Sequence, residues 1–315
     1  MFIKKYGVFL VSLMMVVSAC SSVDSGVDVD SSESSSMGLN LSAEVDKESW
    51  TVTLPWNRYL ISDEEKNILL SASSMALAQC TREKNMAKQW TGTNADFISQ
   101  VNPHVYSEFG PWRKAMAQQY GFSSPYLSND PIVGRDIKPP TETEILKLRR
   151  GFDANSLFSE ADMELMRKEC DEYPAVEKFN REKIAPSAPW VDELGETRML
   201  LFDDPRAQEI VGELEACFDK QGMKMSSEIP GFVEGVNGFI DPTEESIALA
   251  LKAAQCQEET DATPRLAQVW ADLQAPIVKK YAKELIAQRQ LIDERVAEAK
   301  QYIQEHPELL ELPAQ

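Results

Sequence analysis

Apolar residues recur at every third or fourth position over much of this chain, a spacing that places them on one face of an α-helix. The first such run follows Ser62–Glu65, where a serine and a glutamate three residues later form the capping box of a helix amino terminus. Another run follows Ser159, with Asp162 in the place of the glutamate. The pattern predicts one helix that carries Cys80 near its end and a second helix that ends at Cys170.

Three further helices are predicted from start and stop signals. Thr141 opens one of them with a capping box, and Gly151 is expected to end it. The pair Asp204–Pro205 places a cap before a proline at the first helical position, so it opens the helix that carries Cys217. The same order of aspartate and proline opens the predicted helix Pro242–Cys256.

The chain after Pro264 is predicted to form a long helix with one apolar stripe. Pro276 lacks a backbone donor, so we expect it to kink this helix or divide it in two. About 30 helical residues after this proline would span roughly 45 Å. The opposite face is charged and predicts a solvated surface, with a coiled coil or a partner-docking helix as the alternative. The stripe consists of Leu266, Val269, Trp270, Leu273, Ile277, Tyr281, Leu285, Ile292, Val296, Ala299 and Ile303.

Strand-like alternation is weak and is confined to Trp50–Leu54 and Arg198–Phe202. We therefore expect a mainly α fold with few or no strands. Residues 49–315 are predicted to form a single disulfide-stapled helical domain. It would consist of two pseudo-repeats, at about 60–190 and 204–305, and end in the long helix.

The amino terminus has the pattern of an export signal. Lys4 and Lys5 precede the apolar run Val8–Val17. A membrane-spanning helix needs about 20 apolar residues, so this shorter run fits the core of a signal peptide. Residues 20–48 follow, rich in serine and acidic residues and without an aromatic side chain. Such a composition predicts a disordered tether.

The residues Val17-Ser18-Ala19-Cys20 resemble the lipobox of bacterial lipoproteins. The resemblance implies that residues 1–19 are removed and that Cys20 carries acyl chains, which would hold the protein on the extracytoplasmic face of the cell membrane. Val17 is a departure, because the family more often has leucine there. The alternative is an ordinary signal peptide cut after Ala19, which would leave Cys20 free.

The four further cysteines are Cys80, Cys170, Cys217 and Cys256. Thiols in an exported chain usually pair. Cys80 and Cys217 lie in near-repeats, each followed by a charged turn, a residue that tolerates left-handed backbone (Asn85 or Gly222) and a methionine. The simplest pairing is Cys80–Cys170 with Cys217–Cys256, although four cysteines allow three connectivities.

These units also resemble secreted lipoproteins of the actinobacterial type, in which a helix ends in cysteine, four residues, glycine and a hydrophobic residue. The segments Phe109–Ala115 and Tyr120–Phe122 are similar to a middle motif of that family. Asn85 in place of glycine is a departure. The resemblance covers about residues 60–305 and implies an envelope lipoprotein without assigned chemistry.

Composition narrows the classes of function. Asp and Glu number 51 against 32 Lys and Arg, which gives a formal charge of −19. A nucleic-acid binder needs a basic surface, so this charge disfavours nucleic-acid binding. His104 and His306 are the two histidines; the first is expected in a loop and the second at a helix end. No Cys-x-x-Cys pair, phosphate-binding glycine loop or nucleophile motif occurs, so we expect no metal, no cofactor and no catalytic residue. The glycine-rich segment Gly231–Gly238 is expected to be a connector.

Aromatic clusters are the place where we look for a ligand. They could line a carbohydrate-binding groove, although core packing is the preferred interpretation. The candidates are Trp50, Trp56 and Tyr59; Tyr106, Phe109 and Trp112; and Tyr120, Phe122 and Tyr126.

We expect a lipid-anchored envelope protein with a non-enzymatic binding or structural role, whose partners are the membrane through Cys20 and an envelope protein or wall polymer. One alternative is a wall-active glycosidase that uses two of the many carboxylates beside the aromatic groove. Another is a solute-binding lipoprotein of an importer, although such proteins alternate strands and helices.

Overall fold

The protein is described as a computed structural model over residues 39–95, 105–123, 141–236 and 243–313. The chain divides into two units, Met1–Leu39 and Asn40–Gln315, and all helices and strands given below belong to the second unit. The signal peptide, Cys20 and most of the expected tether therefore lie outside the described residues, as do His104 and Tyr126.

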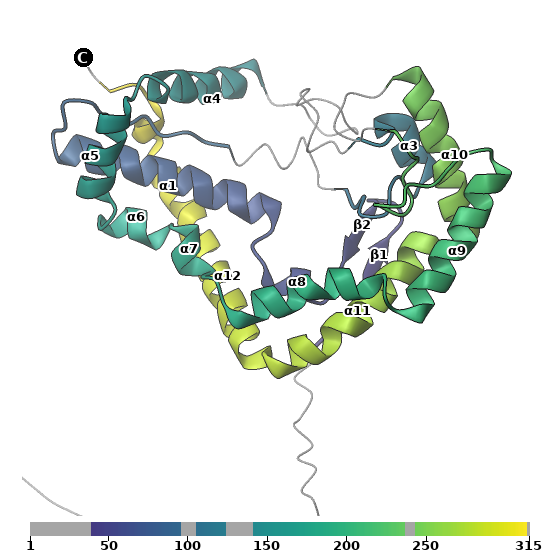
Figure 1. Ribbon diagram of the computed structural model, residues 1–315. Coiled ribbons are helices and arrows are strands. Elements are labelled where there is room, and N and C mark those ends of the chain that lie inside the picture. Colours follow the sequence, from purple (N-terminus) through teal and green to yellow (C-terminus); the bar gives the residue numbers. More distant parts are fainter. Residues whose placement is uncertain (1–38, 96–104, 124–140, 237–242, 314–315) are drawn as a thin grey trace, which may run out of the picture. The chain divides into compact units, whose positions relative to one another are not determined.

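The described residues form eleven α-helices and one two-stranded sheet, which confirms the prediction of a mainly α fold with few strands (Figure 1). Short 3-10 helices lie at Trp56–Tyr59 (η1) and Pro307–Leu310 (η2). The α-helices are α1 (Asp63–Glu83), α3 (Lys114–Tyr120), α4 (Glu142–Asn155), α5 (Glu160–Cys170), α6 (Pro174–Lys178), α7 (Arg181–Ile184), α8 (Pro189–Leu201), α9 (Pro205–Lys220), α10 (Glu244–Thr260), α11 (Ala262–Lys280) and α12 (Ala282–Glu305).

The predicted helix starts are largely confirmed. Ser62, Thr141 and Ser159 each accept a hydrogen bond from the backbone three residues later, and the side chain at that third position closes the capping box. Asp204 caps α9 in front of Pro205. These short-range signals depend only on neighbouring residues, which is why the sequence shows them directly.

Two predicted helix boundaries and one weak strand candidate were wrong. Helix α10 begins at Glu244 behind a Thr243 cap, and the expected start at Pro242 lies outside the described residues. Helix α4 continues through Gly151 to Asn155. The glycine allows close packing against Gly92 and Thr93, because a Cβ there would lie 2.6 Å from Thr93 Cγ2. Arg198–Phe202 is not a strand: it forms the last turn and cap of α8.

One hydrophobic cluster joins α1 to α12, which lie side by side (Figure 1). Ile68, Leu69 and Ala72 of α1 meet Ile292 and Val296 of α12, all at helical spacing and almost without exposed surface. Helices α6 and α7 close the cluster. The expected stripe on α12 therefore packs within this chain, opposite a charged outer face.

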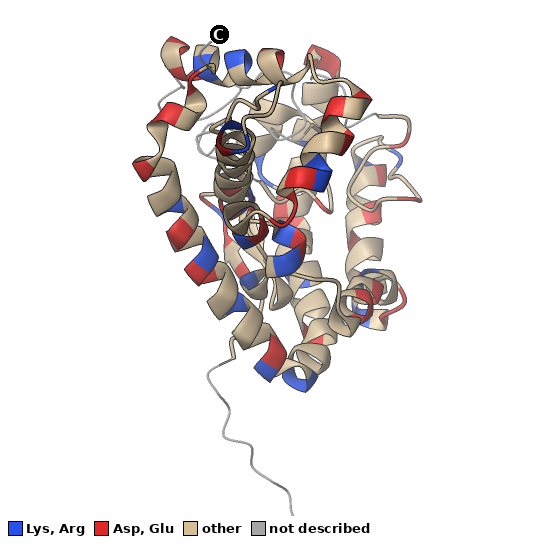
Figure 2. Cartoon of the chain, turned by 90° about the vertical axis from the view of Figure 1, so that its left-hand side faces the viewer, with Lys and Arg blue, Asp and Glu red and all other residues tan. Residues whose placement is uncertain are grey.

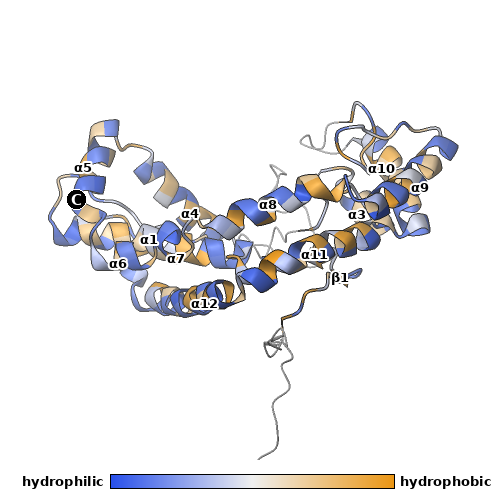
Figure 3. Cartoon of the chain, turned by 60° about the horizontal axis from the view of Figure 1, so that its bottom comes forward, coloured by the Kyte–Doolittle hydropathy of each residue, from blue (hydrophilic) through white to orange (hydrophobic). Residues whose placement is uncertain are grey.

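A larger cluster gathers α8, α9, α10 and α11 with α3. Leu214 and Phe218 of α9 and Leu266 of α11 are fully buried in it. Alanines of α10 allow close contact with α3 and α9. Figure 3 shows that the long helices carry both hydrophobic and hydrophilic residues, as helices with one buried face must.

The long carboxyl-terminal helix divides at a different residue from the one predicted. Helix α11 runs through Pro276 to Lys280, and the chain breaks at Tyr281 before α12 begins. A proline removes one hydrogen bond of a helix but need not end it when the surrounding residues pack well. Here Gln274 and Val278, on either side of Pro276, are buried.

The two strands pair antiparallel, β1 (Glu44–Asp46) with β2 (Thr51–Thr53). Strand β2 falls within the weak candidate Trp50–Leu54. Strand β1 falls within residues 20–48, so the last part of the expected tether is ordered against the body. Ala43 packs against the larger cluster, which explains why this polar segment folds.

Both disulfides join the helices that the simplest pairing predicts. Cys80 of α1 bonds to Cys170 of α5, and Cys217 of α9 bonds to Cys256 of α10, with Cα atoms 6.0 and 5.6 Å apart. Each bond ties the first helix of a predicted pseudo-repeat to a later one.

The near-repeat around Cys80 and Cys217 has the same structure in both places. Asn85 and Gly222 adopt left-handed backbone, with φ of 50° and 71°. Met86 N–H then donates to the carbonyl five residues earlier, on Thr81, and Met223 makes the equivalent bond. Both helices therefore end in a Schellman motif whose methionine turns back toward the core.

Within the described part of the chain, none of the helices combines the length and the apolar character that crossing a bilayer requires.

Candidate functional site

The aromatic candidates are core residues rather than the lining of a groove. Trp50, Trp112 and Tyr120 pack in one small cluster, with the rings of Trp50 and Tyr120 edge to face at 6.1 Å. Tyr106 and Phe122 belong to the large cluster. All five are at least nine-tenths buried.

Three further members of the aromatic clusters also serve packing. Phe109 is buried in the large cluster, and Tyr59 is buried in η1. Trp56 is half-buried, and its backbone N–H donates to Gln274 Oε1 at 3.1 Å. The preferred interpretation of these side chains, core packing, therefore matches their burial.

Burial alters the acid–base chemistry of one of these side chains, Tyr106, without placing it in a catalytic arrangement. Burial of Tyr106, with the nearby charge of Glu108, raises the pKa of its hydroxyl well above the usual value. Trp112 Nε1 donates to the Tyr106 carbonyl at 2.8 Å. The tyrosine is thus held neutral inside the core, where it cannot meet a solute.

A close crossing of two backbone segments positions the candidate site. Gly110 and Gly231 both have positive φ, and a Cβ on Gly231 would lie 1.9 Å from Phe109 O. Only glycine fits so close an approach. The buried amide of Gln257 fastens the crossing, because its Nε2 donates to Phe109 O at 2.5 Å and its Oε1 accepts from Thr263 at 2.9 Å.

The segment that contains Gly231 forms a loop over α9. Met225 and Val233 make an isolated antiparallel bridge, and Ser226 N–H donates to Phe232 O. The ring of Phe232 contacts Phe122 with centroids 5.7 Å apart. These contacts hold the base of the loop, so its tip is presented against α9.

A hollow of about 360 Å³ lies between this loop and α9. Such a volume falls within the range of small-molecule and side-chain pockets. Gln208, Val211, Gly212 and Glu215 lie at spacings of one or two helical turns, so α9 supplies one wall. The lining residues from outside α9 are Phe202, Ser227, Glu228 and Pro230.

The hollow is apolar at its walls and negative in charge. Phe202, Val211 and Pro230 give it apolar surface, whereas Glu215 and Glu228 each bring a carboxylate. Neither carboxylate has an ion-pair partner among the described residues. A cationic group attached to an apolar body would therefore be attracted to it.

Arg206, a cation near the start of α9, is already neutralised. Arg206 binds Asp204 at 2.9 Å and Asp272 at 2.7 Å, and its hydrogen bonds to these carboxylates raise its pKa. Acidic and basic residues are mixed over the helices as a whole (Figure 2). The unpaired carboxylates make this hollow different from a merely solvated, balanced surface.

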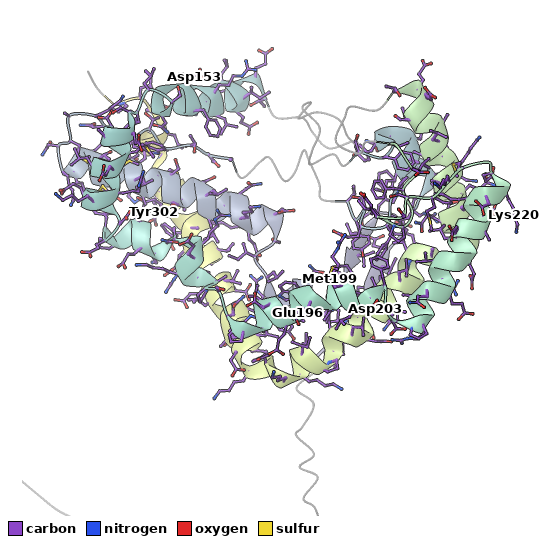
Figure 4. The ribbon with its side chains drawn as sticks, in the orientation of Figure 1. Asp153, Glu196, Met199, Asp203, Lys220 and Tyr302 are labelled. Carbon is purple, nitrogen blue, oxygen red and sulfur yellow. A yellow bond between two sulfur atoms is a disulfide. The ribbon has the colours of Figure 1, made fainter. Side chains whose placement is uncertain are left out.

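Exposed apolar residues neighbour the hollow in the chain. Met199 is 74% exposed and Leu200 51% exposed at the end of α8, just before Phe202. Ile229 is 40% exposed between Glu228 and Pro230. Figure 4 labels Met199 and Asp203, which lie on and just after α8. A binding partner could therefore cover apolar surface beyond the hollow itself.

Two other hollows are lined by charged side chains of both signs. The one of about 330 Å³ beside α6 and α12 includes Lys178 and Glu298, which bind each other at 2.7 Å. The one of about 260 Å³ beside α7 brings Lys66 and Arg181 together with Glu182. In each of these hollows basic and acidic side chains occur together, whereas the charged side chains that line the hollow on α9 are all acidic.

The described histidine and the four cysteines of the body, the remaining residues that could carry chemistry, have structural roles. His306 caps the end of α12, as predicted, with its ring 4.6 Å from that of Tyr302 and its Nδ1 3.2 Å from Glu308 Oε1. All four cysteines of the body are in disulfides. The described residues contain no group of three or more His, Cys, Asp and Glu side chains that could hold a metal ion.

The sequence did not point to the hollow. Gln208, Val211, Gly212 and Glu215 share a helix face, but such mixed faces are common on exposed helices. The glycine-rich segment after Gly231 gave a partial signal, because its glycine marks the crossing that sets the loop. The loop and α9 meet only through tertiary packing.

Compared with protein-family models, curated proteins and solved structures, the chain matches none of them.

Proposed function

We propose that this chain is an exported protein, anchored by acyl chains on Cys20, whose disulfide-stapled helical body binds a partner in the cell envelope. The observation that carries the proposal is the pairing of all four body cysteines in two disulfides between helices. Disulfides of this kind persist in oxidising, extracytoplasmic compartments and are rare in the cytosol. The signal-like run Val8–Val17 and the lipobox-like residues before Cys20 support the same location.

Metabolic labelling tests the anchor. Cells that express the protein are grown with radioactive palmitate, and the purified protein is examined by mass spectrometry. We expect label in the parent protein and a mature chain that begins at an acylated Cys20. Cys20→Ala should lose the label. An unlabelled protein cut after Ala19 would overturn the anchor.

We further propose that the hollow on α9 receives a protein segment in which an apolar side chain lies next to a lysine or an arginine. Its apolar walls and the two unpaired carboxylates, Glu215 and Glu228, suit such a segment. The neighbouring Met199, Leu200 and Ile229 would add contact area around it.

Two exposed helical glycines allow a matched test of this site. A Cβ at Gly212, which lines the hollow, and a Cβ at Gly195 of α8 both meet nothing within 4 Å. Gly212→Trp should fill the hollow without disturbing the backbone, and Gly195→Trp should leave it open.

Proteins cross-linked to each variant in intact envelopes are then identified by mass spectrometry. We expect a partner that is captured by the parent protein and by Gly195→Trp and is lost with Gly212→Trp. Reversal of charge by Glu215→Lys with Glu228→Lys should give the same loss. A partner captured equally by all variants would place binding elsewhere on the body.

A further inference from the structure

Helix α4 has little packing against the rest of the body. Gly151 is its only buried residue, and α4 makes few contacts with other described elements. Its attachment is local: Gly151 rests on Gly92 and Thr93, and the side-chain amide of Asn155 both accepts from and donates to the backbone of Thr91. The rest of α4 is therefore held out from the core.

The free side of α4 is unusually apolar for exposed surface. Leu146 is 52% exposed, Phe152 57% exposed and Leu157, just after the helix, 72% exposed. Ile145, Leu148 and Phe152 lie three and four residues apart, so they share one helix face. None of these side chains belongs to a hydrophobic cluster of the described residues.

The same stretch carries a local excess of positive charge on a chain whose net charge is −19. Lys147, Arg149 and Arg150 are all exposed, and none has an ion-pair partner in the part of the chain that the structure describes. No acidic residue lies between Ile145 and Phe152. Asp153, labelled in Figure 4, follows directly.

We propose that α4 and Leu157 lie on the surface of a bilayer that contains anionic lipid. An amphipathic helix binds such a surface by burying apolar side chains at the level of the headgroups while its cations face lipid phosphates. Charge favours an anionic bilayer as the surface that α4 contacts. An anionic surface repels the acidic body, except at a place where unpaired cations are gathered, as they are on α4.

This inference rests on the proposed anchor, which brings the helix to the membrane. The 20 residues from Cys20 to Leu39 can span at most about 70 Å when fully extended, so the body stays close to the bilayer. Tethering raises the effective concentration of the surface, so that a weak contact by one helix becomes occupied.

The test separates this contact from the anchor. The chain from residue 20 with Cys20→Ser carries no acyl group, and it keeps every described helix, strand and disulfide. It is mixed with vesicles of phosphatidylcholine, with or without phosphatidylglycerol, and the bound fraction is measured by sedimentation. We expect binding to the anionic vesicles only, and its release by added salt.

Two variants of α4 should weaken this binding. Lys147→Ala, Arg149→Ala and Arg150→Ala together should lower the partition coefficient by about fivefold for each cation removed. Leu146→Ser with Phe152→Ser should lower it by about tenfold or more. All five side chains are exposed, so the variants are expected to keep the helical spectrum of the parent.

Matched controls come from other helices. Met199→Ser with Leu200→Ser removes equally exposed apolar side chains from α8, and Lys279→Ala with Lys283→Ala removes exposed cations from α11 and α12. Both should bind as the parent does. Binding that needs no anionic lipid, or that survives the α4 changes, would overturn the proposal. A labelled anchor with no vesicle binding would reject this contact while leaving the anchor in place.

Discussion

Single residues with several partners hold the parts of this fold that lie far apart in the sequence. Gln257 is the clearest case, because it is buried on α10 and bonds to both Phe109 and Thr263. Its amide satisfies groups that would otherwise lie in the core without a partner.

Gln257→Leu should therefore lower the free energy of unfolding by about 2–4 kcal/mol, since it leaves the Phe109 carbonyl and two Thr263 donors unpaired. Urea denaturation under oxidising conditions measures the loss. Gln255→Leu is the control, because Gln255 bonds only to exposed Glu259, and this change should cost no more than about 0.5 kcal/mol. Equal losses in the two variants would contradict the role assigned to Gln257.

A second comparison at this scale uses two glycines of one segment. Gly212 lies within α9, and Gly222 lies just after it with φ of 71°. A Cβ at either position meets nothing within 4 Å, so backbone conformation alone decides the effect. Gly212→Ala should stabilise the protein by up to about 1 kcal/mol, and Gly222→Ala should destabilise it by about 1 kcal/mol. Thermal melts should show midpoint shifts of opposite sign; shifts of the same sign would contradict the αL assignment.

Individual elements are joined by a few partly buried charges as well as by apolar faces. Arg289 of α12 binds Glu65 of α1 at 2.6 Å, and both side chains are about one-fifth exposed. Burial of Glu65 raises its pKa, but hydrogen bonds from Arg289 and Ser62 outweigh this effect, and the net pKa lies below the ordinary value.

A carboxyl whose pKa is lowered by folding stabilises the folded state above its ordinary pKa and loses this contribution as the pH falls through the lowered value. Glu65→Gln should therefore cost about 1–2 kcal/mol at pH 7. The difference from the parent should shrink as the pH falls below the ordinary value of 4.5. Urea denaturation of both proteins across this range measures it. A difference that stays constant with pH would contradict the ion pair.

Elements were predicted well where the signal is local. The capping boxes at Ser62, Thr141 and Ser159 and the helix ends at Asn85 and Gly222 were readable because each depends on residues within one turn. Arg198–Phe202 was a weak strand candidate that proved wrong, because a short apolar run has no clear period. Its place in α8 follows from packing: Leu201 is fully buried in the large cluster.

At the scale of the whole molecule, the two disulfides constrain the unfolded chain. The bonded pairs are separated by 90 residues (Cys80–Cys170) and 39 residues (Cys217–Cys256). Replacing both cysteines of one bond with alanine should cost about 4 kcal/mol for either bond, with about 0.7 kcal/mol more for the longer loop, in the chain-entropy account. Urea denaturation of the two double variants tests the order. A larger loss from the Cys217–Cys256 pair would show that native packing, and not loop length, dominates.

The sequence alone determined the fold class, the main helix starts, the matching helix ends and the cysteines to be paired. These features come from periodicity and from residues close in the chain, whose interactions persist in any arrangement of the helices. The tertiary structure decided the rest. It buried the aromatic residues, carried α11 past Pro276 and drew Gly231 against Phe109 so that a loop faces α9. It also left α4 with few contacts to the other helices that the structure describes. Each of these outcomes depends on contacts between distant segments, which single-sequence patterns do not encode.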